Sequence, residues 1–257
     1  MSSPVRVRSL GGFAQAALVS GEAKVIAVFE RSAYVETPAG LACIGAVGNG
    51  PLNAHCAGPL PQLAVCDILD VDVKDAALWK PRAAVAFDAS LVVASLARLQ
   101  ATASGQTPKE GFGSLLDPTT EKPAGVVALM RWIADPVGVP EGATGLIGLG
   151  PGLTPSGDDL LGGALCALHA AGLVLIASRL GNWVLPIARH ATSRISYAHL
   201  ACAAEGESAE AVNDAIVSIL SGELPDLLRI DAIGHTSGWD ALAGVALALH
   251  AVVRSRK

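Results

Sequence analysis

The chain has 257 residues, of which 51% are hydrophobic and 16% are charged; 18 basic and 23 acidic residues give a formal net charge of −5. This composition excludes an intrinsically disordered chain, which needs low hydropathy and high net charge. It also argues against a nucleic-acid-binding protein, because such proteins gather Lys and Arg on one face and no such cluster is seen. The length predicts one large domain or two small ones with a sizeable core.

Three features bear on the compartment. The five cysteines lie in apolar or Ala-rich surroundings without a C-x-x-C pair, which predicts reduced, buried thiols. Residues 1–12 hold no continuous apolar run, so no signal peptide is expected. Residues 160–178 approach the length of a membrane span, but their glycines, their histidine and the two preceding aspartates favour a buried helix. We therefore expect a cytoplasmic protein that binds neither membrane nor nucleic acid.

The first third of the chain is predicted to be rich in β-strand. Alternating or β-branched runs separated by short polar or Gly-containing breaks predict strands over residues 5–8, 25–29, 33–37, 41–47 and 63–69. From about Pro81 the apolar period becomes helical, with a polar loop over residues 103–125. We expect helices over residues 83–102, 126–134, 160–180, 183–203, 209–221, 225–230 and 239–254. The predicted fold class is α+β, with a β-rich N-terminal domain over residues 1–80 and an Ala- and Leu-rich helical domain over residues 81–257.

The densest local signal is the run GLGPGLTPSGDD, from Gly148 to Asp159, which leads directly into an apolar helix. Glycines let the backbone approach a ligand closely, and prolines fix the turns. Ser156 is expected to cap the helix, with Asp158 and Asp159 in its first turn, where the helix dipole favours carboxylates.

This run has three interpretations. In the first, the N–H groups of the loop and the hydroxyls of Thr154 and Ser156 bind a phosphate or carboxylate. In the second, Asp158 and Asp159 hold a divalent cation such as Mg²⁺ or act as a general base. The two can combine, since a cation would offset the repulsion between the carboxylates and an anion. In the third, Ser and Asp only cap a helix.

A second helix start repeats the first after a shift of 81 residues. The pattern Ser-Gly-x-Asp-x3-Gly occurs at residues 156–163 and again at residues 237–244, so that Asp240 corresponds to Asp159. The repeated pattern indicates a helix start capped by the serine, with the Asp in the first turn. The Gly lies one turn later on the same face, where another backbone can come close. We predict that the two helices pack at small residues and point their N-termini at one pocket; the alternative is a chance likeness of Ala-rich helices.

Other polar residues complete the candidate site. Arg194 lies among the hydroxyl residues of the segment 192–197, within a predicted helix, and is a candidate anion clamp. His235 directly precedes Thr236 and is the best general acid or base among the six histidines. The candidate catalytic residues are His235, Asp159 and Asp240, the candidate metal ligands are Asp158 and Asp159, and the candidate substrate-binding residues are Gly150, Gly152, Thr154, Ser156, Gly157, Arg194, Thr236, Ser237 and Gly238.

The run from Gly148 to Gly162, the run from Gly234 to Asp240 and the earlier Gly50-Pro51 together resemble a bacterial family of unknown function, one branch of which is a subunit of oxamate carbamoyltransferase from anaerobic allantoin degradation. The resemblance covers most of the chain in motif order. It implies phosphorolysis of oxalurate to oxamate and carbamoyl phosphate, carried out with other subunits. The Ser-x-Arg-Thr-Arg phosphate motif of well-known carbamoyltransferases is not recognisable in this sequence, so a separate kind of site must be assumed.

The leading hypothesis is an enzyme, or a subunit of one, that acts on a small anionic substrate. One alternative is a non-catalytic anion-binding or assembly subunit, whose partner carries out the chemistry. Another is a metal-dependent hydrolase that uses Asp158, Asp159 and Asp240, with helix starts that resemble those of ADP-ribosylglycohydrolases.

Overall fold

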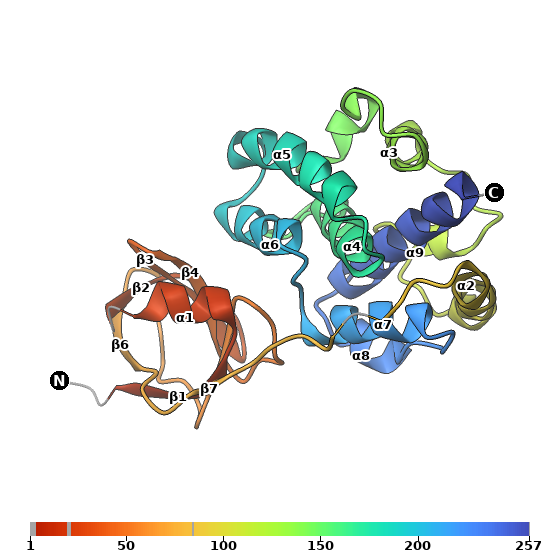
Figure 1. Ribbon diagram of the computed structural model, residues 1–257. Coiled ribbons are helices and arrows are strands. Elements are labelled where there is room, and N and C mark those ends of the chain that lie inside the picture. The colour runs from red at the N-terminus through yellow and green to blue at the C-terminus, as the bar shows by residue number, and fades with distance from the viewer. Residues whose placement is uncertain (1–3, 20–21, 84, 257) are drawn as a thin grey trace. The chain divides into compact units, whose positions relative to one another are not determined.

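The computed structural model describes residues 4–19, 22–83 and 85–256 (Figure 1). The chain divides into two compact units, Met1–Pro81 and Arg82–Lys257. Strands dominate the first unit and helices form the second, which confirms the predicted α+β class. The assignment of residues 1–80 and 81–257 as two domains stays a prediction.

The N-terminal unit is a small closed barrel. Its strands are β1 (Val5–Leu10), β2 (Glu22–Val28), β3 (Ser32–Thr37), β4 (Gly40–Gly45), β5 (Asn53–Cys56), β6 (Ile68–Asp72) and β7 (Ala77–Leu78). They are ordered β5-β4-β3-β2-β6-β1-β7, and a further pairing of β5 with β1 closes the first six into a ring. The pairs β2–β3 and β3–β4 are antiparallel hairpins, whereas β1 runs parallel to β6. Alternate side chains such as Val25 and Val35 fill the interior.

Two elements of this unit differ from the prediction. Residues 63–67 are not a strand, because Ala64 donates its N–H to the Asp67 side chain (2.8 Å) in a turn, and only Ile68–Asp72 pairs as β6. Cys66 lies in that turn with a φ of 80° and is exposed, so the expectation of a buried thiol is wrong for it. The short helix α1 (Gly12–Leu18) and the strands β5 and β7 were not predicted, since each is too short to show a clear period.

Two central helices organise the C-terminal unit. They are α4 (Ser156–Ala170) and α9 (Ser237–Ser255), which lie side by side in Figure 1 and are buried along most of their length. The elements around them are α2 (Ala89–Ala103), α3 (Ala124–Ala134), α5 (Val174–Ala191), α6 (Arg194–Ala204), α7 (Glu210–Leu220), α8 (Leu227–Asp231) and the 3-10 turns η1 (Gly113–Leu116) and η2 (Glu141–Leu146).

Three predicted helix boundaries are corrected. The helix predicted over residues 160–180 is broken at Gly172, whose φ of 76° suits glycine, so α4 ends and α5 begins there. The helix predicted over residues 183–203 is broken at residues 192–193. Helix α2 begins at Ala89 because the Asp88 side chain accepts the N–H groups of Ser90 and Leu91 in its first turn. Among the described residues, no helix combines the length and apolar character that a membrane crossing requires.

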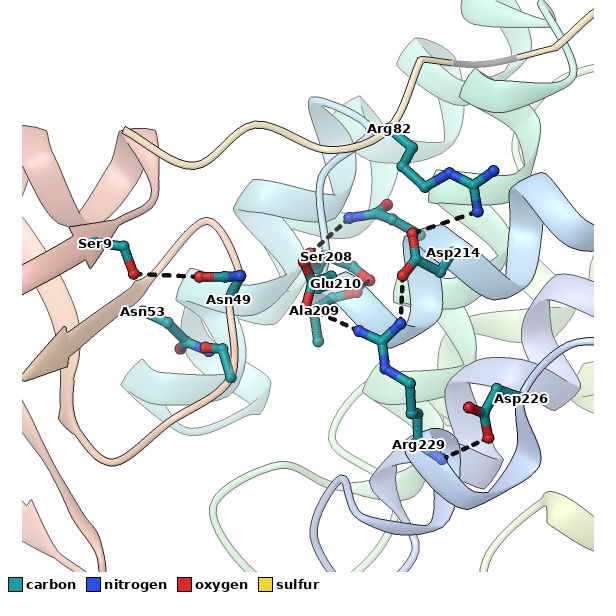
Figure 2. A network of polar contacts seen from close by, with 12 residues as sticks. Ser9, Asn49, Asn53, Arg82, Ser208, Ala209, Glu210, Asp214, Asp226 and Arg229 are labelled. Atoms are coloured by element: carbon teal, nitrogen blue, oxygen red, sulfur yellow. Dashed lines mark hydrogen bonds and ion pairs between the residues drawn. The ribbon is translucent and has the colours of Figure 1, made fainter. Parts of the chain in front are cut away.

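A cluster of charges joins α7 and α8 (Figure 2). The guanidinium of Arg229 on α8 contacts Asp214 (2.5 Å) and Glu210 (2.8 Å) of α7. Arg82, at the beginning of this unit, lies 3.9 Å from Asp214. Because these groups are partly exposed, their ion pairs should contribute little to the free energy of unfolding.

Candidate functional site

The helices α4 and α9 cross at two glycines that correspond to each other in the sequence repeat. A Cβ at Gly163 would lie 2.0 Å from the carbonyl oxygen of Ala241, and a Cβ at Gly244 would lie 2.0 Å from that of Leu160. Each glycine of one helix therefore meets the residue three positions before the glycine of the other. The prediction that the two helices pack at small residues is confirmed, and the contact has a local two-fold character.

The turns that lead into the two helices also correspond. The N–H of Gly157 donates to Leu149 (2.9 Å), and that of Gly238 donates to Ile233 (3.1 Å). A Cβ at Gly157 would lie 1.9 Å from the Leu146 carbonyl oxygen, just as one at Gly238 would lie 2.0 Å from a backbone carbonyl. Eight positions separate Leu149 from Gly157 and five separate Ile233 from Gly238. The additional residues before α4, from Gly150 to Pro155, form a segment that we call the Gly-Pro loop.

The two serines do not cap their own helices, contrary to the prediction. Pro155 and Thr236 occupy the N-cap positions, and neither makes a side-chain cap. Ser156 and Ser237 are the first helical residues, and their hydroxyls interact with Asp240 and Asp159 on the opposite helix. Each serine thus lies near the aspartate of the other helix, and the Thr236 hydroxyl lies near Asp240 as well.

Asp159 and Asp240 are the least satisfied polar groups of this crossing. Asp240 is fully buried and Asp159 half-buried; in each, the Oδ2 atom is buried without a hydrogen-bond partner. Burial raises the pKa of Asp159 well above its ordinary value; the Ser237 hydroxyl opposes this, and the charges of Asp240 and Asp158 add to it. Burial also raises the pKa of Asp240, against the N–H of Phe112, which donates to its Oδ1.

Asp158 has a different environment from its neighbour in sequence. Its Oδ1 accepts the N–H of Gly148 (2.8 Å), and its Oδ2 accepts the hydroxyls of Thr192 (2.5 Å) and Ser196 (2.7 Å). These bonds join α4 to the turn before the Gly-Pro loop, to the α5–α6 connection at Thr192 and to the first turn of α6 at Ser196. The hydroxyl residues at positions 192–196 therefore lie at and just after a helix break. Asp158 and Asp159 contact different residues. Across the described residues, no three His, Cys, Asp or Glu side chains gather as a metal site.

The Gly-Pro loop presents free donors at the N-terminal end of α4. Gly150 and Gly152 have φ values of 124° and 85° and are exposed. Within the described part of the chain, the N–H groups of Gly150, Gly152 and Thr154 have no acceptor. Together with the positive end of the helix dipole, such N–H groups favour an anion.

Two side chains hold this loop against its neighbours. The Thr154 hydroxyl lies 3.0 Å from that of Ser237, which links the loop to α9. The Ser193 hydroxyl donates to the Leu153 carbonyl (2.5 Å) and also caps α6. Arg194, the next residue, is exposed at the N-terminal end of α6. The structure thus brings Thr154 and Ser237 together and places Arg194 in the segment that is bonded to the loop.

The start of α9 is covered by a segment that the sequence did not single out. Phe112 bonds to Asp240, and a Cβ at Gly111 would lie 2.4 Å from the Asp240 Oδ1. His235 is exposed, with its Nε2 atom 3.8 Å from Glu110 in the same segment. Glycines on both sides of Phe112, in the loop predicted as merely polar, were the one available signal, and it is a weak one.

The fold and the site define a helical unit in which two equivalent helix starts meet, preceded in the chain by a six-stranded barrel. Residues 146–249 match the model of a family described as oxamate carbamoyltransferase subunit AllH. The resemblance seen in the sequence is therefore confirmed over this segment, which runs from the turn before α4 into α9 and includes both helix starts. Neither a curated protein nor a solved structure gave a significant match to the chain.

Proposed function

We propose that the protein is a subunit of a carbamoyl-transferring enzyme and binds a small anionic substrate at the paired helix starts. The observation that carries this proposal is the loop from Gly150 to Thr154, exposed as far as Leu153, with its free N–H groups at the N-terminal end of α4. The family match supports it, because the matched residues include this loop and the whole crossing of α4 and α9 as far as Leu249.

The substrate class follows from the donors that are available. Backbone N–H groups bind the oxygens of phosphate or carboxylate whatever the rest of the molecule is, and a helix N-terminus favours negative charge. Arg194 would add a planar cation that can bind two anionic oxygens at once. These donors suit phosphate, oxamate, oxalurate and carbamoyl phosphate alike.

The proposed reaction is the phosphorolysis of oxalurate, in which phosphate attacks the carbamoyl carbon and oxamate leaves. The developing oxyanion needs hydrogen-bond donors already in place, and both reactants must be held together. The Gly-Pro loop would provide such donors on one side. Since the match describes a subunit, we propose that other chains complete the site.

Ligand-dependent stabilisation tests this proposal. The full chain is unfolded thermally with phosphate, carbamoyl phosphate or oxamate at increasing concentration. A ligand that binds only the folded state stabilises it by about 2.7 kcal/mol at one hundred times its dissociation constant. Arg194→Gln should raise the dissociation constant of the anion about tenfold, whereas Arg98→Gln, which changes an exposed arginine on α2, should leave it unchanged. Failure of all three anions to stabilise the wild-type chain would contradict the proposal.

A further inference from the structure

The crossing of α4 and α9 buries two carboxyl groups that have no basic partner in the described part of the chain. The Oδ2 atoms of Asp159 and Asp240 have no hydrogen-bond partner, and Asp240 is fully buried. Within the described ranges, no Lys, Arg or His forms an ion pair with either group. A buried, unpaired carboxylate is strongly unfavourable, so these atoms require a proton or a cation.

We propose that Asp159 and Asp240 together bind one divalent metal ion, of the Mg²⁺ or Mn²⁺ class, between the N-terminal ends of α4 and α9. The two carboxyls occupy the same position in the repeated helix start, and the glycine contacts hold the helices at their closest approach. A ligand between two such groups is bound equally by both helices.

The donor set at the crossing consists of oxygen atoms. Besides the carboxyls, the hydroxyls of Ser156 and Ser237 face the opposite aspartates, and the Ser237 hydroxyl also meets that of Thr154. Hard divalent cations take oxygen ligands, and Mg²⁺ commonly uses one or two carboxylates, completing its shell with water or substrate phosphate. Two carboxylates without a third acidic ligand suit this mode.

This inference deepens the proposed function and rests on it for its role in catalysis. An anion bound at the Gly-Pro loop is repelled by two negative carboxylates near the same helix start. A divalent cation would neutralise that charge and give a phosphate group a positive partner. The sequence predicted Asp158 and Asp159 as the cation ligands. We instead propose Asp159 and Asp240, because Asp158 already accepts three hydrogen bonds.

The direct test is titration of the EDTA-treated full chain with Mn²⁺, with free Mn²⁺ followed by electron paramagnetic resonance. We expect one Mn²⁺ per chain, displaced by excess Mg²⁺, with weaker affinity at pH 5 than at pH 7.5 because protons compete for the carboxylates. Asp159→Asn and Asp240→Asn should each weaken binding at least tenfold. Asp135→Asn, which alters an exposed aspartate at the end of α3, is the matched control and should bind as the wild type does.

Absence of Mn²⁺ binding by the wild-type chain at millimolar concentration would overturn the inference, as would unchanged binding by Asp159→Asn. The half-buried Asp159 allows a decision even where Asp240→Asn does not fold. The anion test is run separately, once in EDTA and once with saturating Mg²⁺. Stabilisation by phosphate without Mn²⁺ binding would reject the metal site and keep the proposed function, whereas Mn²⁺ binding without any anion effect would do the reverse.

Discussion

Over eight residues, the two helix starts of the C-terminal unit are identical at five positions, and their largest chemical difference is the residue between Gly and Asp. At α4 this residue is Asp158, which accepts hydrogen bonds from the turn before the helix, from the α5–α6 connection and from α6. At α9 it is Trp239, whose ring N–H donates to Asp231 (2.8 Å) and whose Cβ lies close to Gly113. The shared residues thus build the crossing, whereas the residue that differs attaches each helix to its own surroundings.

This difference separates residues that must fit a partner helix from residues that only stabilise a local turn. It also shows why Asp158 and Asp159, adjacent in sequence, are not equivalent. Successive residues of a helix point in directions about 100° apart, so the first carboxylate faces hydroxyl donors while the second faces α9.

The largest effect is expected from Gly163→Ala. The added Cβ would lie 2.0 Å from a backbone carbonyl of α9, so the helices must move apart, which should cost about 3 kcal/mol or more of unfolding free energy. Urea unfolding measures the loss, and Gly244→Ala should match it. The control is Gly162→Ala, whose Cβ meets Ala203 Cβ at an ordinary 3.6 Å and should be neutral or stabilising. Equal losses in Gly162→Ala and Gly163→Ala would refute the close crossing.

Asp158→Ala should come next, with a loss of about 2–3 kcal/mol at pH 7. It leaves three donors without their buried acceptor, and bonds to charged groups are stronger than neutral ones. Urea unfolding again measures it. Asp158→Asn should lose less, because the hydroxyls of Thr192 and Ser196 can turn to accept from its amide. Wild-type stability in Asp158→Ala would show that this side chain does not hold the loop.

Asp159→Asn should behave in the opposite way in metal-free buffer. Because the pKa of Asp159 is raised in the folded state, the folded chain binds more protons than the unfolded chain above pH 4, and wild-type stability falls as pH rises through the folded pKa. The variant lacks this titration, so it should be as stable as the wild type near pH 4 and more stable at pH 8. Unfolding in EDTA across this range checks the sign; parallel curves for variant and wild type would contradict it.

Ser156→Ala and Ser237→Ala should each lose about 1 kcal/mol, as expected for one hydroxyl interaction with a carboxyl. Their near equality tests the two-fold character of the crossing. Ser237→Ala should lose slightly more, since its hydroxyl also meets Thr154. Thermal unfolding of both variants in the same buffer gives the comparison, and a large effect in one with none in the other would break the correspondence of the two starts.

The smallest effect is expected from Arg229→Gln, outside the helix starts. Its ion pairs with Asp214 and Glu210 are partly exposed, so the loss should be about 0.5 kcal/mol and should shrink in 1 M NaCl. Unfolding at low and high salt measures it. A loss as large as that of Asp158→Ala would mean that this surface cluster, rather than the helix starts, dominates the stability of the unit.

The amino-acid sequence by itself determined the α+β class, most of the long helices and the correspondence of the two helix starts, because these depend on apolar periodicity and on a repeated local pattern. It could not show where the helices within residues 160–203 end and begin. The sequence stays apolar and Ala-rich across the breaks at Gly172 and Ser193, so the helical period does not reveal them. Nor could it find the cover of Asp240 by Phe112, which joins positions far apart in the chain.

Only the tertiary structure decided the roles of the individual side chains. The sequence predicted the serines as caps and the adjacent aspartates as one pair. Folding instead pairs each serine with the aspartate of the other helix and gives Asp158 three donors of its own. The physical reason is that a local pattern fixes where a helix begins, whereas the partner of a buried polar group depends on which distant segment packs against it.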